Sequence, residues 1–285
     1  MYEYNLDNLT DEQKKQLEET YKNTDFSKIQ KEIDDNDNSA EIFFNQFHWV
    51  KIENFISKET ADILYHHVKH NAIRLDILYQ DWQDKSREDK QLINQIWGTF
   101  DDPQAEGDFS KYGDPIFDSL LDSSLPQMEK LTGKKLLPNY SYHRLYTNDT
   151  ELERHKDRPS CEISTTLCLG YDNSNVDSKT YPDYNWPMWV QEDGGKALPI
   201  SMKPGDMLIY RGCEVWHWRE HFKGNNHAQL FMHYNEANGN YNIKYDGRPF
   251  LGLPSSYRDE KSVNINDKDN DFLKWYYIYG QHHFI

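Results

Sequence analysis

The chain has 285 residues and a formal net charge of −16, with 48 acidic against 32 basic side chains. This length fits one large domain or two small ones, and the acidic balance disfavours a nucleic-acid partner. No stretch approaches the roughly 18 apolar residues that a transmembrane helix needs, so we expect no membrane partner. Three cysteines, Cys161, Cys168 and Cys213, form no CxxC pair and fit a reducing compartment. The segment MYEYNLDNLTDEQKKQ has no secretory signal pattern, and we predict a cytoplasmic protein.

Helices dominate the predicted N-terminal part. Residues 1–40 are polar and strongly charged, and Thr10 with Gln13 gives the capping-box pattern of a short exposed helix before a soft linker. The segment FHWVKIENF, residues 47–55, has the apolar, strand-favouring residues of a first strand. From Ser57 onward, apolar residues recur at helical spacing. We therefore expect a strand that is followed at once by a helix.

Two further helical segments are predicted before the chain changes character. The charged region up to residue 112 gives a weak helical signal around KQLINQIW, residues 90–97. A second amphipathic helix covers residues 115–132 despite Pro126, and Gly133 is its expected C-cap.

Strands are expected after Pro138. From there to residue 253, β-rich segments alternate with Gly, Pro and Asn-Gly turns, which is the rhythm of a sandwich or barrel. This order of elements predicts a mainly β protein with N-terminal helices, an α+β arrangement. The domain plan is an extension at 1–40 and a single domain at 41–285, with helical support at 57–132, a β core at 138–253 and a docked C-terminal segment at 268–285.

A histidine and an aspartate lie two residues apart in the segment ELERHKDRPSCEISTTLCLG, at His155 and Asp157. In a strand, residues i and i+2 point to the same side, so the two side chains converge on one object. A divalent metal is the obvious candidate, because a face of two histidines and one carboxylate leaves positions open for a co-substrate and O₂ on a non-haem iron. A third ligand is then needed from another strand.

Context favours one of the downstream histidines as the third ligand. The segment KPGDMLIYRGCEVWHWREHF contains a turn, an apolar strand, Gly212 and then His217. If the β segments wind round one barrel, a strand, a break and then His217 bring the chain back to the end of the barrel where the His-x-Asp pair lies. The histidines that stay open as alternatives are His221, His227 and His233.

At this point the sequence resembles the Fe(II)/2-oxoglutarate-dependent oxygenases, and among them the prolyl 4-hydroxylase-like branch of bacterial and phage type. The resemblance covers about residues 47–235 and consists of ordered pieces: FHWVKIENFISKETADIL, Tyr146, HKD, DGGKALPI, the PGD turn and VWHWRE. It implies a double-stranded β-helix, or jelly roll, with iron at one mouth. The implied activity is that of an oxidoreductase, a hydroxylase that uses Fe(II), 2-oxoglutarate and O₂, with ascorbate as a reductant.

The resemblance also implies roles for particular residues. His155, Asp157 and His217 take the positions of the catalytic metal ligands, and Tyr146 and Tyr171 fall where the family often places tyrosines near 2-oxoglutarate.

The sequence departs from the family at the residue that holds the distal carboxylate of 2-oxoglutarate. The family has an Arg or Lys about ten residues after the second histidine, and this chain has His227 there. A buried carboxylate needs a cation or several donors. Arg219 is favoured, because it lies two residues after His217 and faces the same way in a regular strand. Arg144, or His227 together with Gln229, are the alternatives.

The substrate is predicted from the resemblance and from a long aromatic loop between Tyr171 and the double glycine. A loop of this length is uncommon unless it is functional or disordered, and its aromatics either close over an extended peptide or pack on the sheet. Arg158 is expected either at the substrate or paired with Glu153 or Glu162. Residues assigned to the substrate are Arg158, Trp186, Trp189 and Trp216.

The function predicted from these residues is hydroxylation of an unactivated C–H bond, first of a peptidyl proline, with release of succinate and CO₂. A free amino acid, a nucleic-acid base and a small metabolite remain as substrates. The competing interpretations are a metal-dependent, cupin-like non-oxidative enzyme and a jelly-roll binding module without iron.

Overall fold

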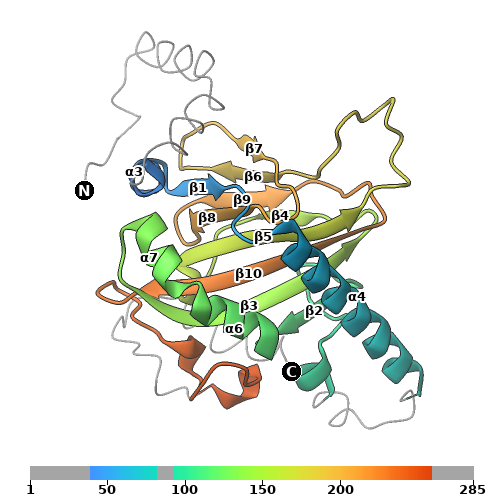
Figure 1. The fold of residues 1–285 in the computed structure, drawn as a ribbon, viewed down its shortest axis with the longest axis horizontal. Helices are drawn as coiled ribbons and strands as arrows, with labels where there is room; N and C mark the ends of the chain where they lie inside the picture. The colour runs from blue at the N-terminus through green and yellow to red at the C-terminus, as the bar shows by residue number, and fades with distance from the viewer. Residues whose placement is uncertain (1–38, 82–92, 259–285) are drawn as a thin grey trace.

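The computed structural model describes residues 39–81 and 93–258. Its two β-sheets face each other, and helices cover the outer face of the larger one (Figure 1). This arrangement is the mainly β, jelly-roll class that the sequence predicted. The proposed N-terminal capping box and the C-terminal segment 268–285 lie outside the described residues.

The large sheet is antiparallel throughout and contains the longest strands. Its order is β1-β8-β5-β10-β3-β2. The bounds are β1 Trp49–Ile52, β8 Met207–Arg211, β5 Ile163–Asp172, β10 Asn226–Glu236, β3 Leu136–Thr147 and β2 Phe109–Tyr112. The region before residue 112 was expected to be at most weakly helical, so β2 is a strand that the sequence did not predict.

The small sheet has the order β4-β9-β6-β7 and is also antiparallel. Its bounds are β4 Leu152–His155, β9 Trp216–Arg219, β6 Met188–Gln191 and β7 Leu198–Ile200. The turn at Pro204–Asp206 was predicted correctly: Gly205 has φ +96, a backbone region that glycine adopts without steric cost, and β8 follows it. The last described strand ends at Glu236, so the predicted β region, which ran to residue 253, was too long.

Helices pack on the outer face of the large sheet (Figure 1). Their bounds are α3 Ser39–Phe47, α4 Lys58–Asp81, α6 Pro115–Ser123 and α7 Leu125–Thr132. The Ser57 hydroxyl accepts from the backbone N–H of Thr60, the expected N-cap contact of α4. Gly133 is left-handed at φ 68 and closes α7 as predicted.

Three expectations about these elements were wrong. The predicted strand 47–55 is shorter, because Phe47 still belongs to α3 and the strand covers only β1. Residues expected in a linker begin α3 at Ser39. The predicted helix 115–132 is two helices that meet at Ser124, just before Pro126, because a proline interior to a helix removes a hydrogen bond and clashes with the preceding turn.

The core lies between the large sheet and its helices. Buried Val68, Leu75, Phe117 and Leu230 belong to one continuous apolar cluster. Packing on one face leaves the other face of the large sheet free to meet the small sheet. The polar residues on that second face build the site described next.

Candidate metal and co-substrate site

The histidine and aspartate pair lies at the end of β4. His155 is the last residue of β4 and pairs in register with His217 of β9. Asp157 lies beyond the strand, and its backbone N–H donates to the Gly212 carbonyl at 2.8 Å. The argument that placed both residues on one strand face was therefore wrong for Asp157, although the carboxylate still reaches His155. A backbone contact to the turn after β8, and not strand alternation, holds it there.

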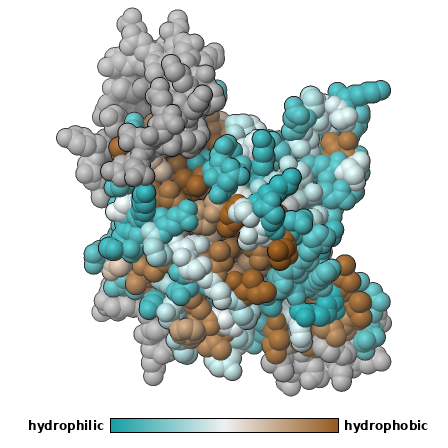
Figure 2. All heavy atoms as spheres, viewed as in Figure 1, coloured by the Kyte–Doolittle hydropathy of each residue, from teal (hydrophilic) through white to brown (hydrophobic). Residues whose placement is uncertain are grey.

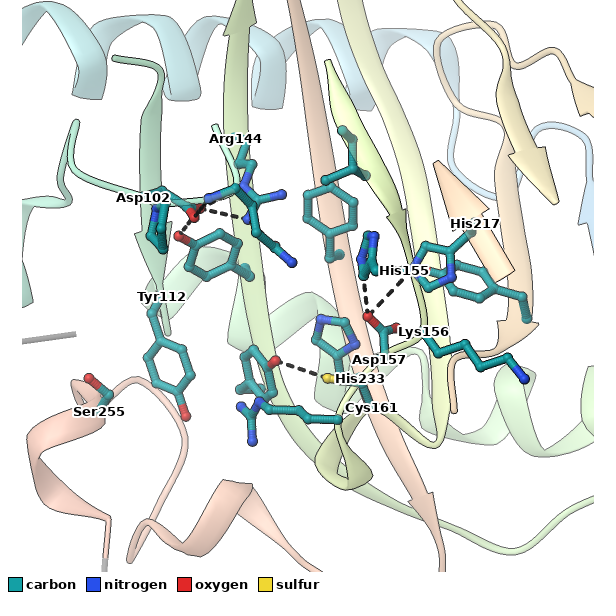
Figure 3. Close-up of a pocket in the computed structure, with 18 of the residues that line it drawn as sticks. Asp102, Tyr112, Arg144, His155, Lys156, Asp157, Cys161, His217, His233 and Ser255 are labelled. Carbon is teal, nitrogen blue, oxygen red and sulfur yellow. Dashed lines mark hydrogen bonds and ion pairs between the residues drawn. The ribbon is translucent and has the colours of Figure 1, made fainter. Parts of the chain in front are cut away.

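The two imidazoles present the same nitrogen to one carboxylate oxygen. His155 Nε2 lies 3.7 Å and His217 Nε2 lies 3.4 Å from Asp157 Oδ1. The other ring nitrogen of each contacts a backbone carbonyl: Nδ1 of His155 at 2.7 Å from Glu153 O, and Nδ1 of His217 at 2.9 Å from Val215 O. Both rings are thereby held as Nδ1–H tautomers with an Nε2 lone pair turned to the same point (Figure 3).

The second oxygen of Asp157 is held by residues of the large sheet. Ser164 Oγ donates to Asp157 Oδ2 at 2.7 Å and also contacts His233 Nδ1 at 3.0 Å. Ser164 was interpreted from the sequence as an ordinary strand residue. Its position at the start of β5, directly after the loop that carries Asp157, is the signal that could have identified it.

The charges of this group suit a divalent cation. Burial, with a smaller effect of His217, lowers the pKa of His155 to about 4, so its imidazole is neutral near pH 7. Burial would raise the pKa of Asp157, but His217, His155 and His233 together outweigh it and hold that pKa well below its usual range. Two imidazoles and one carboxylate are the donors that a non-haem iron takes. Their ligand atoms lie within 4.8 Å of one another, so the residues fit such an ion.

The other candidate histidines have different surroundings. His221 is exposed and contacts Asp149 and Glu151 at the surface. His233 belongs to a second group of potential ligand atoms with Asp157 and Cys161. His227 is buried farther along the barrel interior, beside Gln229 and Cys168.

Arg219 is a buried cation on the same face of β9 as His217. Both side chains are 1% exposed, whereas Trp216 and Trp218 between and beside them are partly exposed. Arg219 Nη1 donates to the Trp186 carbonyl, but its Nε and Nη2 have no hydrogen-bond partner in the described residues. Burial lowers its pKa from the ordinary value, which reflects the cost of an uncompensated buried charge.

Aromatic residues surround this guanidinium. The Arg219 side chain lies over the Trp186 ring at 4.7 Å, and Trp186 meets Tyr146 edge to face at 5.0 Å. Tyr210 contacts the His217 ring at 4.7 Å. Tyr210 lines the same pocket as His155, Asp157 and His217.

The remaining residues expected near 2-oxoglutarate lie on neighbouring strands. Tyr171 of β5 pairs with His227 of β10 and stacks on it at 5.3 Å. Gln229 contacts His227 and accepts from Thr166 at 2.8 Å. Burial lowers the pKa of His227 well below its usual range, so this residue is neutral and brings no charge for a carboxylate.

Arg144 is already paired. It contacts Asp102 at 2.6 Å, donates to Gln104 at 2.7 Å and to the Tyr146 hydroxyl at 3.2 Å. An ion pair with a carboxylate is what we expect for an arginine in so acidic a chain. Arg219 is therefore the better placed of the two arginines for an incoming carboxylate.

A pocket opens beside the histidines and is lined by Arg158 but not by the three tryptophans assigned to the substrate. Arg158 forms an ion pair with Asp246 at 2.9 Å, a partner that the sequence analysis did not consider. Trp186 is buried against Arg219 instead. Trp189 stacks on Trp218 at 5.9 Å, and Trp216 lies under Arg154 at 3.9 Å, on the face of the small sheet that is turned away from the pocket.

Comparison with known proteins agrees with this architecture. No protein-family model matches the chain, and no curated protein sequence does. Among solved structures, the fold is similar to that of the non-heme alpha ketoglutarate dependent carbocyclase SnoK from nogalamycin biosynthesis, at 13% identity over 78% of this chain and 94% of that chain, with a TM-score of 0.50. At so low an identity the similarity shows the fold alone.

Two prolyl hydroxylases are also similar structures. The Pseudomonas putida prolyl-4-hydroxylase has 14% identity over 70% of this chain and 98% of its own, with a TM-score of 0.46. The Trichoplax adhaerens prolyl hydroxylase, solved with a hypoxia inducible factor peptide, has 14% identity over 73% and 91%, with a TM-score of 0.45. The similarity to SnoK agrees with the jelly-roll fold that the sequence resemblance predicted.

Proposed function

We propose that this protein is an Fe(II)- and 2-oxoglutarate-dependent dioxygenase that hydroxylates an unactivated C–H bond and releases succinate and CO₂. The first candidate for the substrate is a peptidyl proline or another amino-acid residue. O₂ is the second co-substrate and ascorbate a reductant that keeps iron in the ferrous state. The free state of all three cysteines supports a cytoplasmic location.

The observation that carries the proposal is the shared orientation of the two imidazoles. Both donate Nδ1–H to a backbone carbonyl and turn Nε2 toward Asp157 Oδ1. An ordinary pair of strand histidines has no reason to share this tautomer and target. We assign the three metal ligands to His155, Asp157 and His217.

We assign the distal carboxylate of the co-substrate to Arg219. Arg219 is buried without a carboxylate partner in the described residues, and a guanidinium matches a carboxylate through two parallel hydrogen bonds. An incoming 2-oxoglutarate would supply the missing acceptors through its distal carboxylate. We place Tyr146, Tyr171, His227 and Gln229 around it as neutral neighbours, and Arg144 as the support of Tyr146.

The protein's own contribution is to fix and shield these groups. Bound iron, together with 2-oxoglutarate and O₂, supplies the oxidising chemistry. The backbone carbonyls of Glu153 and Val215 orient the imidazoles, and Ser164 orients the carboxylate. The burial of His217 and Arg219 keeps bulk water from the inner side of the site.

Turnover of 2-oxoglutarate tests the proposal. Purified protein supplied with Fe(II), 2-oxoglutarate and ascorbate should form succinate, and His155→Ala and Asp157→Ala should abolish it because each removes a ligand. His221→Ala, a change to an exposed histidine, is the matched control and should retain full turnover. Iron binding without succinate would favour the cupin-like non-oxidative enzyme, and absence of iron binding would favour the binding module.

The anchor is tested in the same assay. Arg219→Met keeps much of the side-chain volume and removes the charge, so the KM for 2-oxoglutarate should rise by about 100-fold, the worth of a lost charged pair. Metal affinity, measured separately with Mn(II), should stay near that of the unaltered protein. An unchanged KM for 2-oxoglutarate would remove Arg219 from the proposal.

A further inference from the structure

A second group of potential metal ligands adjoins the first. In the described part of the chain, Asp157, Cys161 and His233 bring a carboxylate oxygen, a thiol sulfur and an imidazole nitrogen within 4.8 Å of one another. The function proposed above uses only Asp157 of these three as a ligand. All three side chains line the pocket of about 380 Å³ that opens beside His155 and His217.

The Asp157 carboxylate belongs to both groups and uses its two oxygens differently. Oδ1 faces Nε2 of His155 at 3.7 Å and Nε2 of His217 at 3.4 Å. Oδ2 accepts from the Ser164 hydroxyl, which itself lies 3.0 Å from His233 Nδ1. Figure 3 shows the carboxylate with the first two imidazoles on one side and His233 on another. A carboxylate in this position can bridge two metal ions, as in other two-metal sites.

Hydrogen bonding fixes the tautomer of His233. The Ser164 hydroxyl has one proton, and two acceptors compete for it, Asp157 Oδ2 at 2.7 Å and the Cys161 carbonyl at 2.9 Å. The contact between Ser164 and His233 Nδ1 therefore takes its proton from the imidazole. Nε2 of His233 keeps its lone pair and makes no hydrogen bond within the described residues. This nitrogen is thus available to a metal ion, like the same nitrogens in the first group.

The backbone and a tyrosine hold Cys161 in place. Cys161 ends the 3₁₀ helix η2, Pro159–Cys161, and its N–H donates to the Arg158 carbonyl at 2.8 Å. It is a free cysteine, 3% exposed, and its sulfur contacts the Tyr140 hydroxyl at 3.0 Å. The Tyr140 ring also lies 4.5 Å from the His233 ring. Tyr140 therefore packs against both donors and fixes their spacing.

The second group differs from the first in the kind of ion that it suits. A thiolate sulfur is a soft ligand that favours Zn²⁺ and similar ions. Zn²⁺ takes Cys, His and Asp ligands in tetrahedral sites, and three protein ligands leave one position open. When the sulfur binds, the S–H bond breaks and its proton passes to the solvent. The thiolate and the carboxylate then bring two negative charges, and the bridging carboxylate shares its charge with the iron.

We propose, resting on the metal ligands assigned above, that Asp157, Cys161 and His233 form a second metal site for a thiophilic divalent cation such as Zn²⁺, with Asp157 as the bridge to the iron. The centre then holds two different ions, iron at the two imidazoles and the thiophilic ion at the sulfur. The open position of the second ion faces the pocket, because all three of its ligands line that pocket. This position is available to an oxygen atom of a substrate.

Anaerobic titration of the metal-free full chain with Co(II) tests this assignment. Co(II) replaces Zn²⁺ in tetrahedral sites, and a cobalt–thiolate bond gives a charge-transfer band in the near ultraviolet that imidazole and carboxylate ligands do not give. We expect two equivalents of Co(II) to bind, one of them with this band.

Variants then separate the two sites. Cys161→Ser keeps the size of the side chain and removes the sulfur, so the band and one equivalent should be lost. Cys213→Ser is the matched control, because Cys213 is only partly buried and so the most accessible of the three thiols, and it should keep both. His155→Ala should lose the other equivalent and keep the band. Asp157→Ala should lower the affinity for both ions by more than about tenfold, because a ligand contributes more than an orienting contact does. Thermal unfolding checks that each variant is folded.

Three results would overturn the inference: no charge-transfer band in the unaltered protein, a band that survives in Cys161→Ser, or a band that is lost in His155→Ala, since one ion would then contact both groups. If one equivalent binds without the band, the second site fails and the proposed iron site stands. If His155→Ala removes no equivalent, the ligands proposed for iron fail.

Discussion

Each histidine of the candidate metal site uses its two ring nitrogens for different purposes. Nδ1 of His155 and of His217 contacts a backbone carbonyl, which leaves Nε2 available to a metal ion. The carboxylate of Asp157 is divided in a similar way, with Oδ2 held by Ser164 and Oδ1 turned to the imidazoles. Two backbone carbonyls and one serine thus orient the three candidate metal ligands without being ligands themselves.

Ser164→Ala should weaken metal binding without removing a ligand. The change deletes the 2.7 Å bond to Asp157 and the contact to His233, so the carboxylate is free to rotate. Loss of such an orienting contact typically costs about 10- to 100-fold in metal affinity. The affinity for Mn(II) or Co(II), measured by calorimetry, checks this expectation.

Ser119→Ala is the control for this change, because Ser119 is exposed on α6 and donates only to the Pro115 carbonyl. Its metal affinity should equal that of the unaltered protein. Equal affinities for the Ser164 variant and this control would show that Asp157 does not depend on the serine.

At the scale of elements, the loops between strands fix the position of Asp157. Gly212 lies in the turn between β8 and β9, where its carbonyl accepts from Asp157 and its N–H donates to the Glu162 carbonyl. A Cβ at this position would overlap the Cys161 carbonyl, the Asp157 carboxylate and the Ser164 hydroxyl. A side chain larger than hydrogen therefore does not fit beside the carboxylate.

Gly212→Ala should displace Asp157 and destabilise the fold together. Forced overpacking in a dense site costs about 1–3 kcal/mol, and metal affinity should fall by about tenfold or more as the carboxylate moves. Chemical denaturation and metal titration measure the two effects. Gly195→Ala places a Cβ 3.3 Å from the Glu192 carbonyl, which needs only a shift of a few tenths of an ångström, so it should change both values far less. Normal metal binding in the Gly212 variant would contradict the proposed packing.

The sequence predicted the elements whose signals are local. The PGD turn, the Gly133 cap and the apolar strand MLIY after the turn each depend on a few neighbouring residues, and all three are present. Asp157 was assigned beside His155 by strand alternation, but β4 ends at His155, so that reason does not apply to it. Two features involve partners far apart in the chain, the pairing of Arg158 with Asp246 and the packing of Trp186 on Arg219. No spacing rule within one segment predicts such long-range contacts.

At the scale of the whole molecule, the two faces of the large sheet have different surroundings. The helical side of the large sheet exposes isoleucines, and Figure 2 shows hydrophobic residues among polar ones on that face. Those on α4 and α6 are Ile63, Ile73, Ile77 and Ile116. No helix in the described part of the chain is long and apolar enough to cross a membrane. The opposite face of the large sheet, together with the small sheet, encloses the candidate site.

A cluster of ionisable residues joins the two sheets at one edge. His48, just before β1, lies 3.5 Å from Glu192, which follows β6, and 3.6 Å from Glu214, which precedes β9. Burial and the charge of Glu214 raise the pKa of Glu192 to about 7. Burial lowers the pKa of His48, so at neutral pH it brings no full charge to balance the two carboxylates.

Glu192→Gln should therefore stabilise the protein, and more at pH 8 than at pH 5. The pKa of Glu192 is higher in the folded than in the unfolded chain, so the folded state binds more protons between about pH 4.5 and 7. Stability from this residue is present below that window and is lost as the pH rises through it. His48 has the opposite effect below about pH 6.5, which leaves Glu192 to dominate above that pH.

Thermal unfolding at the two pH values measures the difference. Because Glu192 is partly exposed, the effect is reduced by solvent, and we expect a rise in Tm of about 2 °C at pH 8 and less at pH 5. Glu153→Gln, an exposed change on β4 of the same sheet, should shift neither value. Equal shifts at both pH values would mean that Glu192 titrates normally, and that the two sheets meet at this edge without the repulsion between Glu192 and Glu214.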